Sequence, residues 1–176
     1  MPPSPIPTEH RQVMMRANRA LGASLVEHNL ITIEVLEAAN ERLLELMADE
    51  NAEAVSLLQV LVNEKQALTE GQLLSYQNEE MGLGLVDLSN YDQPYELRKR
   101  IDIGACYATW TVPFDIEEGM HFLASAYYLS PAARSYWERF LDTPILWFVT
   151  STENINDFLR KLKLERENEG MGVRAS

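Results

Sequence analysis

Histidine and cysteine side chains are the ones best suited to bind metal ions or act as nucleophiles, and this sequence has four of them. His10, His28 and His121 are far apart and show no ligand spacing on one helix. The single cysteine, Cys106, lies in an apolar run, where a small buried side chain is the ordinary interpretation. One cysteine can form neither an intramolecular disulfide nor a cysteine zinc site. We therefore predict no metal site.

Motifs that cradle a phosphate or activate a serine are also missing from the sequence. There is no G-x-x-x-x-G-K-[ST] loop, and Gly82-Leu83-Gly84 lacks the third glycine of a dinucleotide fingerprint. No serine stands in a G-x-S-x-G elbow, and the many carboxylates are typical of solvated helix faces. The sequence therefore predicts no resident cofactor and no enzymatic activity.

The net charge of the chain limits the classes of molecule that can bind to it. The chain has 15 Lys and Arg against 27 Asp and Glu, a formal net charge of -12 and a pI near 4.7. Such a chain repels phosphate backbones, so we expect no nucleic-acid partner. One basic cluster, Arg98-Lys99-Arg100, follows a short helical stretch. It is either a solvated helix end, where cations are favourable, or a docking site for an acidic group.

Targeting signals are not evident. The N-terminus, MPPSPIPTEH, has no cationic start followed by an apolar core, and no later apolar run approaches the roughly 20 residues of a membrane span. We expect a cytoplasmic protein without membrane insertion.

An internal repeat organises the first half. The run Leu21–Val26 is echoed by Leu57–Val62, and each copy is followed by a threonine, Thr32 and Thr69, with an acidic residue just beyond it. Self-similarity at a spacing of about 35 residues is typical of duplicated helical hairpins. We expect Asn29 to end the first helix in a left-handed conformation and the two threonines to cap the helices that follow.

The second half alternates strands and helices. We predict strands at 106–114, 120–128 and 144–149, a helix at 131–141 capped by Ser130, and a final helix from about residue 152. This β-β-α-β-α order predicts a small mixed sheet with helices on one face. The fold class is therefore α+β: a pair of packed helical hairpins followed by a mixed-sheet subdomain.

These patterns divide the chain into four parts. We predict a disordered proline-rich tail at 1–10, a helical tandem-repeat subdomain at 11–80, an α+β subdomain at 81–164 and a flexible charged tail at 165–176.

The two repeats, the run from Gly84 to Asp92 and the β-β-α-β-α half with Val112-Pro113 and Ser130-Pro131 resemble one bacterial family. It is the N-terminal domain of type II secretion and type IV pilus assembly ATPases, and the resemblance covers about residues 15–164. The resemblance implies an adaptor that docks a motor to an inner-membrane platform protein. A subset of the family binds cyclic di-GMP through tandem R-L-G-x-x-L-[LV]-x-x-G motifs.

The first repeat keeps part of that ligand-binding motif and departs from it elsewhere. Ala20 stands where the motif arginine is expected, Arg19 is one residue out of register, and Asn29 replaces the second glycine. In the second repeat Ser56 and Leu58 occupy the arginine and glycine positions, and one extra residue precedes Thr69. The candidate nucleotide-binding residues are those that match the motif, together with the shifted arginine: Arg19, Leu21, Gly22, Leu25, Val26, Leu30 and Ile31.

Two functions follow from these observations. The first is a non-catalytic adaptor or regulatory module, expected to stand alone because no motor follows, that docks to a protein of secretion, pilus or other envelope machinery. The second is an effector that binds cyclic di-GMP through the degenerate first repeat. Aromatic residues of the second half are either sheet–helix core or, where exposed, anchors for a partner: Tyr127, Tyr128, Tyr136, Trp137, Phe140 and Trp147.

Overall fold

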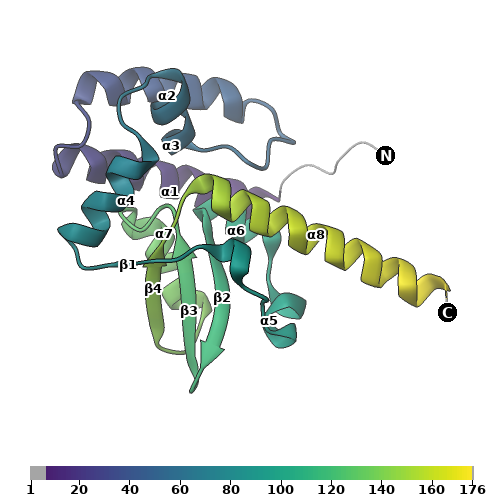
Figure 1. Cartoon of the computed structure of the whole chain (residues 1–176). Helices are drawn as coiled ribbons and strands as arrows, with labels where there is room; N and C mark the ends of the chain where they lie inside the picture. The colour runs from purple at the N-terminus through teal and green to yellow at the C-terminus, as the bar shows by residue number, and fades with distance from the viewer. Residues whose placement is uncertain (1–6, 176) are drawn as a thin grey trace.

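The structure, a computed structural model, describes residues 7–175, and Figure 1 shows a helical upper part above a small sheet. Residues 1–6 of the predicted disordered tail, 1–10, lie outside the described residues, but Thr8–His10 form the first turn of helix α1. The helical part comprises α1 (Thr8–Glu27), α2 (Ile33–Met47), α3 (Leu57–Gln59), the π-helix η1 (Val60–Glu64) and α4 (Glu70–Glu79). The remaining elements are β1 (Gly84–Leu85), the 3-10 helix η2 (Leu88–Asn90), α5 (Tyr95–Arg100), α6 (Ile103–Thr109), β2 (Thr111–Glu117), β3 (Met120–Ser125), α7 (Pro131–Phe140), β4 (Ile145–Val149) and α8 (Thr152–Ala175).

The first hairpin follows the sequence prediction closely. α1 ends where Asn29 takes a left-handed conformation with φ of 57°. The side chain of Thr32 then accepts a hydrogen bond from the backbone N–H of Val35 and caps α2. The short link returns α2 antiparallel to α1 (Figure 1), and apolar residues of both helices belong to one core cluster.

The second hairpin repeats this plan with one change. Gln66 is left-handed, with φ of 49°, and Thr69 caps α4, in each case 37 residues after Asn29 and Thr32. The preceding apolar runs, from Leu21 and Leu57, are only 36 residues apart. The π-helix η1 lies between the two landmarks, and a π-turn holds one more residue than an α-turn. It therefore accommodates the extra residue before the second threonine.

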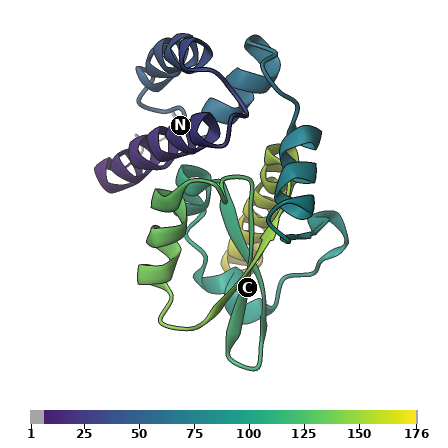
Figure 2. The same cartoon turned by 90° about the vertical axis from the view of Figure 1, so that its left-hand side faces the viewer.

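The sheet is mixed, with strand order β1-β4-β3-β2. The β2–β3 pair is antiparallel, and β4 lies parallel to both β3 and β1. The α+β class is confirmed. The expectation of helices on one face is wrong, since Figures 1 and 2 place α7 and α8 on opposite sides of the sheet. The chain crosses over through α7 between the parallel strands β3 and β4, and α8 follows on the other face.

Two predicted boundaries differ from the structure. Residues Ile103–Thr109 form helix α6, so the predicted strand at 106–114 starts only at Thr111. Asp102 accepts a hydrogen bond from the backbone N–H of Ala105 and caps this helix, and Trp110, with φ of 46°, ends it. The aromatic and β-branched residues here favour a strand locally, but the cap and the left-handed residue define a helix. At the C-terminus α8 continues to Ala175, past the predicted boundary at residue 164.

A single apolar cluster runs through both halves of the molecule. It joins side chains of α1 and α3 to residues of α6, β2, β3, α7 and α8. The core includes residues from both sides of position 80, where two subdomains were predicted to meet. The division into subdomains stays a prediction.

A buried polar joint ties the helical half to the sheet half. The side-chain oxygen of Asn18 accepts hydrogen bonds from the backbone N–H of Leu57 at 3.0 Å and from the hydroxyl of Tyr127 at 2.7 Å. The hydroxyls of Tyr127 and Ser56 lie 2.7 Å apart, and Ser130 donates to the carbonyl of Ala17. All the side chains of this joint are buried, and burial raises the pKa of Tyr127. Since a buried polar group without a partner is costly, these bonds fix how the two halves sit together.

Candidate functional site

Three of the seven predicted nucleotide-binding residues are buried inside helix α1. Leu21, Gly22 and Leu25 are buried in the middle of α1. A Cβ added to Gly22 would lie 2.6 Å from Leu36 Cδ1 and 3.1 Å from Leu57 Cδ2. This glycine therefore allows α1, α2 and α3 to approach one another, and the surrounding space is filled by protein.

The other four residues lie in two separate places. Val26, Leu30 and Ile31 line a hollow of about 410 Å³ beside the left-handed turn. Arg19 is exposed and lines a different groove, of about 220 Å³, between α1 and α2. The remaining residues that line the hollow are uncharged: Asn29, Thr32, Val35 and Ala67. The structure thus brings the three apolar positions together and separates the arginine from them.

The histidines and the cysteine have structural partners. His10 Nε2 lies 3.0 Å from Asp102, His28 Nδ1 lies 2.8 Å from the hydroxyl of Tyr76, and His121 Nδ1 lies 2.6 Å from the hydroxyl of Thr143. Burial raises the pKa of the Cys106 thiol, which disfavours its nucleophilic thiolate. Within residues 7–175 no group of three or more His, Cys, Asp or Glu side chains is arranged to hold a metal ion.

The motif from Gly84 to Asp92 anchors the start of α8 to the sheet. Gly84 lies against the ring of Phe148, where an added Cβ would come within 3.0 Å. The Asn154 side chain accepts from the backbone N–H of Leu88 and donates to Asp87. These contacts give the segment from Gly84 to Asp92 a structural role.

The basic cluster is divided between two roles. The Arg98 guanidinium lies 3.5 Å from Glu165 and 3.4 Å from Glu169 on α8. Lys99 and Arg100 are exposed, and Lys99 lies over the ring of Tyr95. The first arginine therefore holds α5 against α8, and the other two cations face solvent.

An apolar cleft opens between α5 and α7, and we call it the α5–α7 cleft. Its volume is about 320 Å³. Trp137, 2% exposed, lies in its wall, and Phe140, 59% exposed, stands at its edge. The ring of Phe140 stacks on Tyr136 at 5.9 Å between centroids. The other apolar lining residues are Leu97, Ile101, Pro113, Ile116 and Leu141.

The charged groups around this cleft are mostly acidic. Glu96, Asp102 and Asp142 border it together with one cation, Arg100. His121 also lines it, and burial lowers the pKa of this imidazole, which favours the neutral form at neutral pH. Two carboxylates are thus in excess over the single guanidinium.

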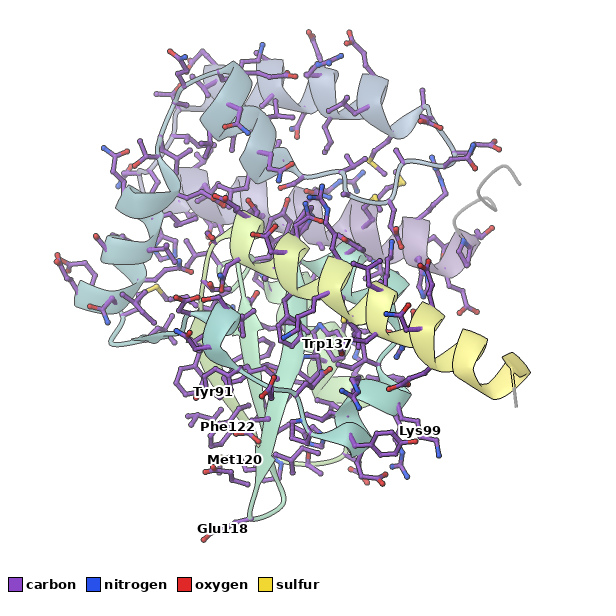
Figure 3. The ribbon with its side chains drawn as sticks, turned by 45° about the vertical axis from the view of Figure 1, so that its right-hand side comes forward. Tyr91, Lys99, Glu118, Met120, Phe122 and Trp137 are labelled. Carbon is purple, nitrogen blue, oxygen red and sulfur yellow. The ribbon has the colours of Figure 1, made fainter. Side chains whose placement is uncertain are left out.

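A second group of apolar side chains, partly exposed, lies on another part of the sheet. In Figure 3 Tyr91, Phe122 and Met120 follow one another down one side of the strands, above Glu118 at the hairpin tip. The ring of Tyr91 packs edge-on against Phe114 at 4.9 Å between centroids. Tyr91 is exposed, and Met120 and Phe122 are half-buried. The α5–α7 cleft is concave, which is the form that ligand sites usually take.

Sequence comparisons with known proteins give no match, neither to a family model nor to a curated protein. Comparison with solved structures gives clear matches. A structure of MshE with cdg, that is, cyclic di-GMP, aligns at 17% identity with a TM-score of 0.51, covering 81% of this chain and 97% of that one. Two structures of the N-terminal domain of XpsE align at 18% identity with TM-scores of 0.52, covering 82% and 78% of this chain and 94% and 90% of theirs.

This chain has the fold of those N-terminal domains. The resemblance predicted from the two repeats and the sheet half is confirmed at the level of the fold. Within the described residues, 7–175, no helix is both long and apolar enough to cross a membrane.

The cleft was not predicted from the sequence, although two of its residues were singled out there. Trp137 and Phe140 were among the aromatic residues expected to be either core or anchors. One is buried and the other is exposed. Their spacing of three residues on α7 puts them on neighbouring sides of the helix, and this was the signal available in the sequence.

Proposed function

We propose that this protein is a non-catalytic adaptor that docks to a protein of secretion, pilus or other envelope machinery. The observation that carries the proposal is the α5–α7 cleft, an apolar cleft with an exposed aromatic edge on a fold shared with N-terminal domains of XpsE and MshE. Exposed aromatic side chains next to a preformed pocket are frequent anchors of protein interfaces.

Phe140 is the residue whose loss tests this docking. We expect Phe140→Ala to abolish capture of the partner, because truncating a central aromatic anchor typically costs about 2 kcal/mol or more of binding energy. The measurement is affinity capture from native cells followed by mass spectrometry. The matched control is Leu164→Ala, which removes an equally exposed apolar side chain, 60% exposed, from α8.

Three results would contradict the proposal. The wild-type chain could recover no secretion, pilus or envelope component. The Phe140 variant could capture the partner as well as the wild type does. The Leu164 variant could lose the partner to the same extent, which would place docking outside the α5–α7 cleft.

We propose cyclic di-GMP binding as a second candidate function, supported by one specific feature. Beside the hollow lined by Val26, Leu30 and Ile31, the first repeat keeps the close helix approach at Gly22. A nucleotide seated there would need a cation, and Arg19 lies in the neighbouring groove.

Isothermal titration with cyclic di-GMP, with GTP as a control ligand, tests this second function. Saturable binding that is lost in Arg19→Ala and retained in Arg16→Ala would support it, since both arginines are exposed on α1. An absence of heat at low salt and high ligand concentration would exclude it, because low salt strengthens contacts to phosphate.

A further inference from the structure

We infer that the α5–α7 cleft takes one aromatic or long aliphatic side chain of the partner, and that lysine or arginine residues flank that side chain. The inference rests on the proposed function for the existence of a partner, and it adds the chemistry by which that partner is recognised.

Several polar atoms in the cleft walls are already used within the protein. Trp137 Nε1 donates to Thr109 Oγ1 at 2.9 Å, and the carbonyl of Pro113 accepts from Gln93 Nε2 at 2.7 Å. The Nδ1 of His121 is occupied by Thr143. An inserted polar side chain would find few groups to replace its bonds to water, so the cleft favours an apolar group.

The cleft is large enough to take one bulky side chain. Its volume of about 320 Å³ lies at the lower end of the range of roughly 300–1,000 Å³ for small-molecule sites. The buried residues at its base, Leu97, Ile101 and Trp137, form an apolar surface, and the exposed ring of Phe140 leaves one side open. A side chain presented by a protein segment can enter from that side.

The carboxylates at the rim determine what flanks the side chain. Asp102 already accepts from the backbone N–H of Ala105 and contacts His10. Glu96 and Asp142 are exposed, and the Glu96 carboxylate has only a distant contact, 4.0 Å, with Arg100. These two carboxylates lie on opposite elements of the cleft, after Pro94 at the start of α5 and after the end of α7. They can therefore face cations on both sides of an inserted side chain.

Arg100 offsets one of the three carboxylates at the rim, and the other cations nearby do not reverse the preference. Lys99 lies over Tyr95 on the outer part of α5, toward solvent in Figure 3. Glu138 and Arg139, exposed on α7 just before Phe140, carry opposite charges. The net charge of -12 adds a long-range attraction for a basic segment.

The three tryptophans supply a direct test by NMR. Only Trp137 lines the α5–α7 cleft, since Trp110 is buried against the carbonyl of Val55 and Trp147 packs on Tyr128. The probes are three capped peptides, Lys-Lys-Phe-Lys-Lys, Glu-Glu-Phe-Glu-Glu and Lys-Lys-Ser-Lys-Lys, titrated into the full chain labelled with ¹⁵N.

We expect the lysine–phenylalanine peptide to shift the Trp137 indole N–H signal saturably and to leave the other two indoles in place. The glutamate peptide and the serine peptide should each bind about tenfold more weakly, the first by repulsion and the second by loss of the apolar contact. The double variant Glu96→Gln with Asp142→Asn should remove the preference for lysine. Glu138→Gln, the matched control outside the lining, should keep it.

No shift of Trp137 with the lysine–phenylalanine peptide, or equal shifts with the glutamate peptide, would overturn the inference. Equal binding of the serine peptide would also overturn it, because charge alone would then explain the interaction. If the peptides do not bind while Phe140→Ala still loses the partner, only the inferred chemistry fails. If the lysine–phenylalanine peptide binds but no envelope component is captured, only the proposed function fails.

Discussion

The two helical hairpins share landmarks and differ in how they fill the space between helices. In the first, a glycine at position 22 lets Leu36 and Leu57 come close to the backbone of α1. In the second, the equivalent position is Leu58, a side chain that is 1% exposed and fills the space itself. In the first repeat the helices thus approach one another closely, and in the second a large side chain fills the space between them. Two copies of one pattern can diverge in packing while the turn that follows keeps its geometry.

Among the changes that test this difference in packing, removal of the Leu58 side chain should have the largest effect on stability. We expect Leu58→Ala to lower the free energy of unfolding by about 2–5 kcal/mol, because it leaves a cavity in the core. Urea denaturation measures the change. The control is Leu44→Ala on α2, where a side chain 63% exposed should change stability by no more than about 0.5 kcal/mol. Equal costs at the two positions would show that volume does not support the second repeat.

A larger residue at position 22 should have the next largest effect on stability. We expect Gly22→Val to cost about 1–3 kcal/mol, since its Cβ would displace Leu36 and Leu57. Gly71→Ala on α4 is the matched control, because the Cβ added there meets only Thr69 Oγ1 at 3.8 Å. That control should stabilise the protein by roughly 0.4–1 kcal/mol. A Gly22 variant as stable as the wild type would remove close approach as the distinguishing feature of the first repeat.

Loss of the two threonine caps should show a smaller difference in stability between the repeats. Thr69 accepts from the backbone N–H of Gln72 at 3.0 Å, and the Gln72 side chain accepts in return from the Thr69 N–H at 2.9 Å. Thr32 accepts one bond, at 3.3 Å. Loss of a cap costs about 0.5–2 kcal/mol, so we expect Thr69→Ala near the upper end and Thr32→Ala near the lower end. The reverse order in thermal or urea denaturation would contradict the prediction.

Glycine substitutions at the two left-handed residues should give the smallest difference in stability. Asparagine adopts this conformation more readily than glutamine does. We therefore expect Gln66→Gly to stabilise the protein by about 0.5 kcal/mol and Asn29→Gly to change its stability little. Paired urea denaturation curves check this, and a larger gain at Asn29 would refute it.

Local signals were enough to predict most of the helical half. Asn29, Thr32 and Thr69 act through bonds within a few residues of themselves, and the sequence displays such bonds directly. The extra residue before Thr69 was visible as well, although the π-helix that holds it was not. Helix α6 was missed because Tyr107, Trp110 and their neighbours favour strands, and the cap at Asp102 went unused in the prediction.

The candidate site was much harder to predict. The α5–α7 cleft joins residues from Glu96 to Asp142 on four elements, α5, β2, β3 and α7, and on the segments that follow the two helices, and only the folded sheet brings them together. Sequence alone placed Arg19 with the apolar motif residues, but the helical rotation separates it from Val26 and Leu30. A one-residue shift of register turns a side chain by about 100° on a helix, and this decides which hollow it lines.

The buried joint around Asn18 also has a mechanical consequence. Ser130, the N-cap of α7, donates a hydrogen bond to the carbonyl of Ala17, so the helix that carries Phe140 is bonded at its first turn to α1. Asn18 and Tyr127 add a second connection next to it. A pull applied at the far end of α7 would therefore be transmitted to α1 through two adjacent, buried hydrogen bonds.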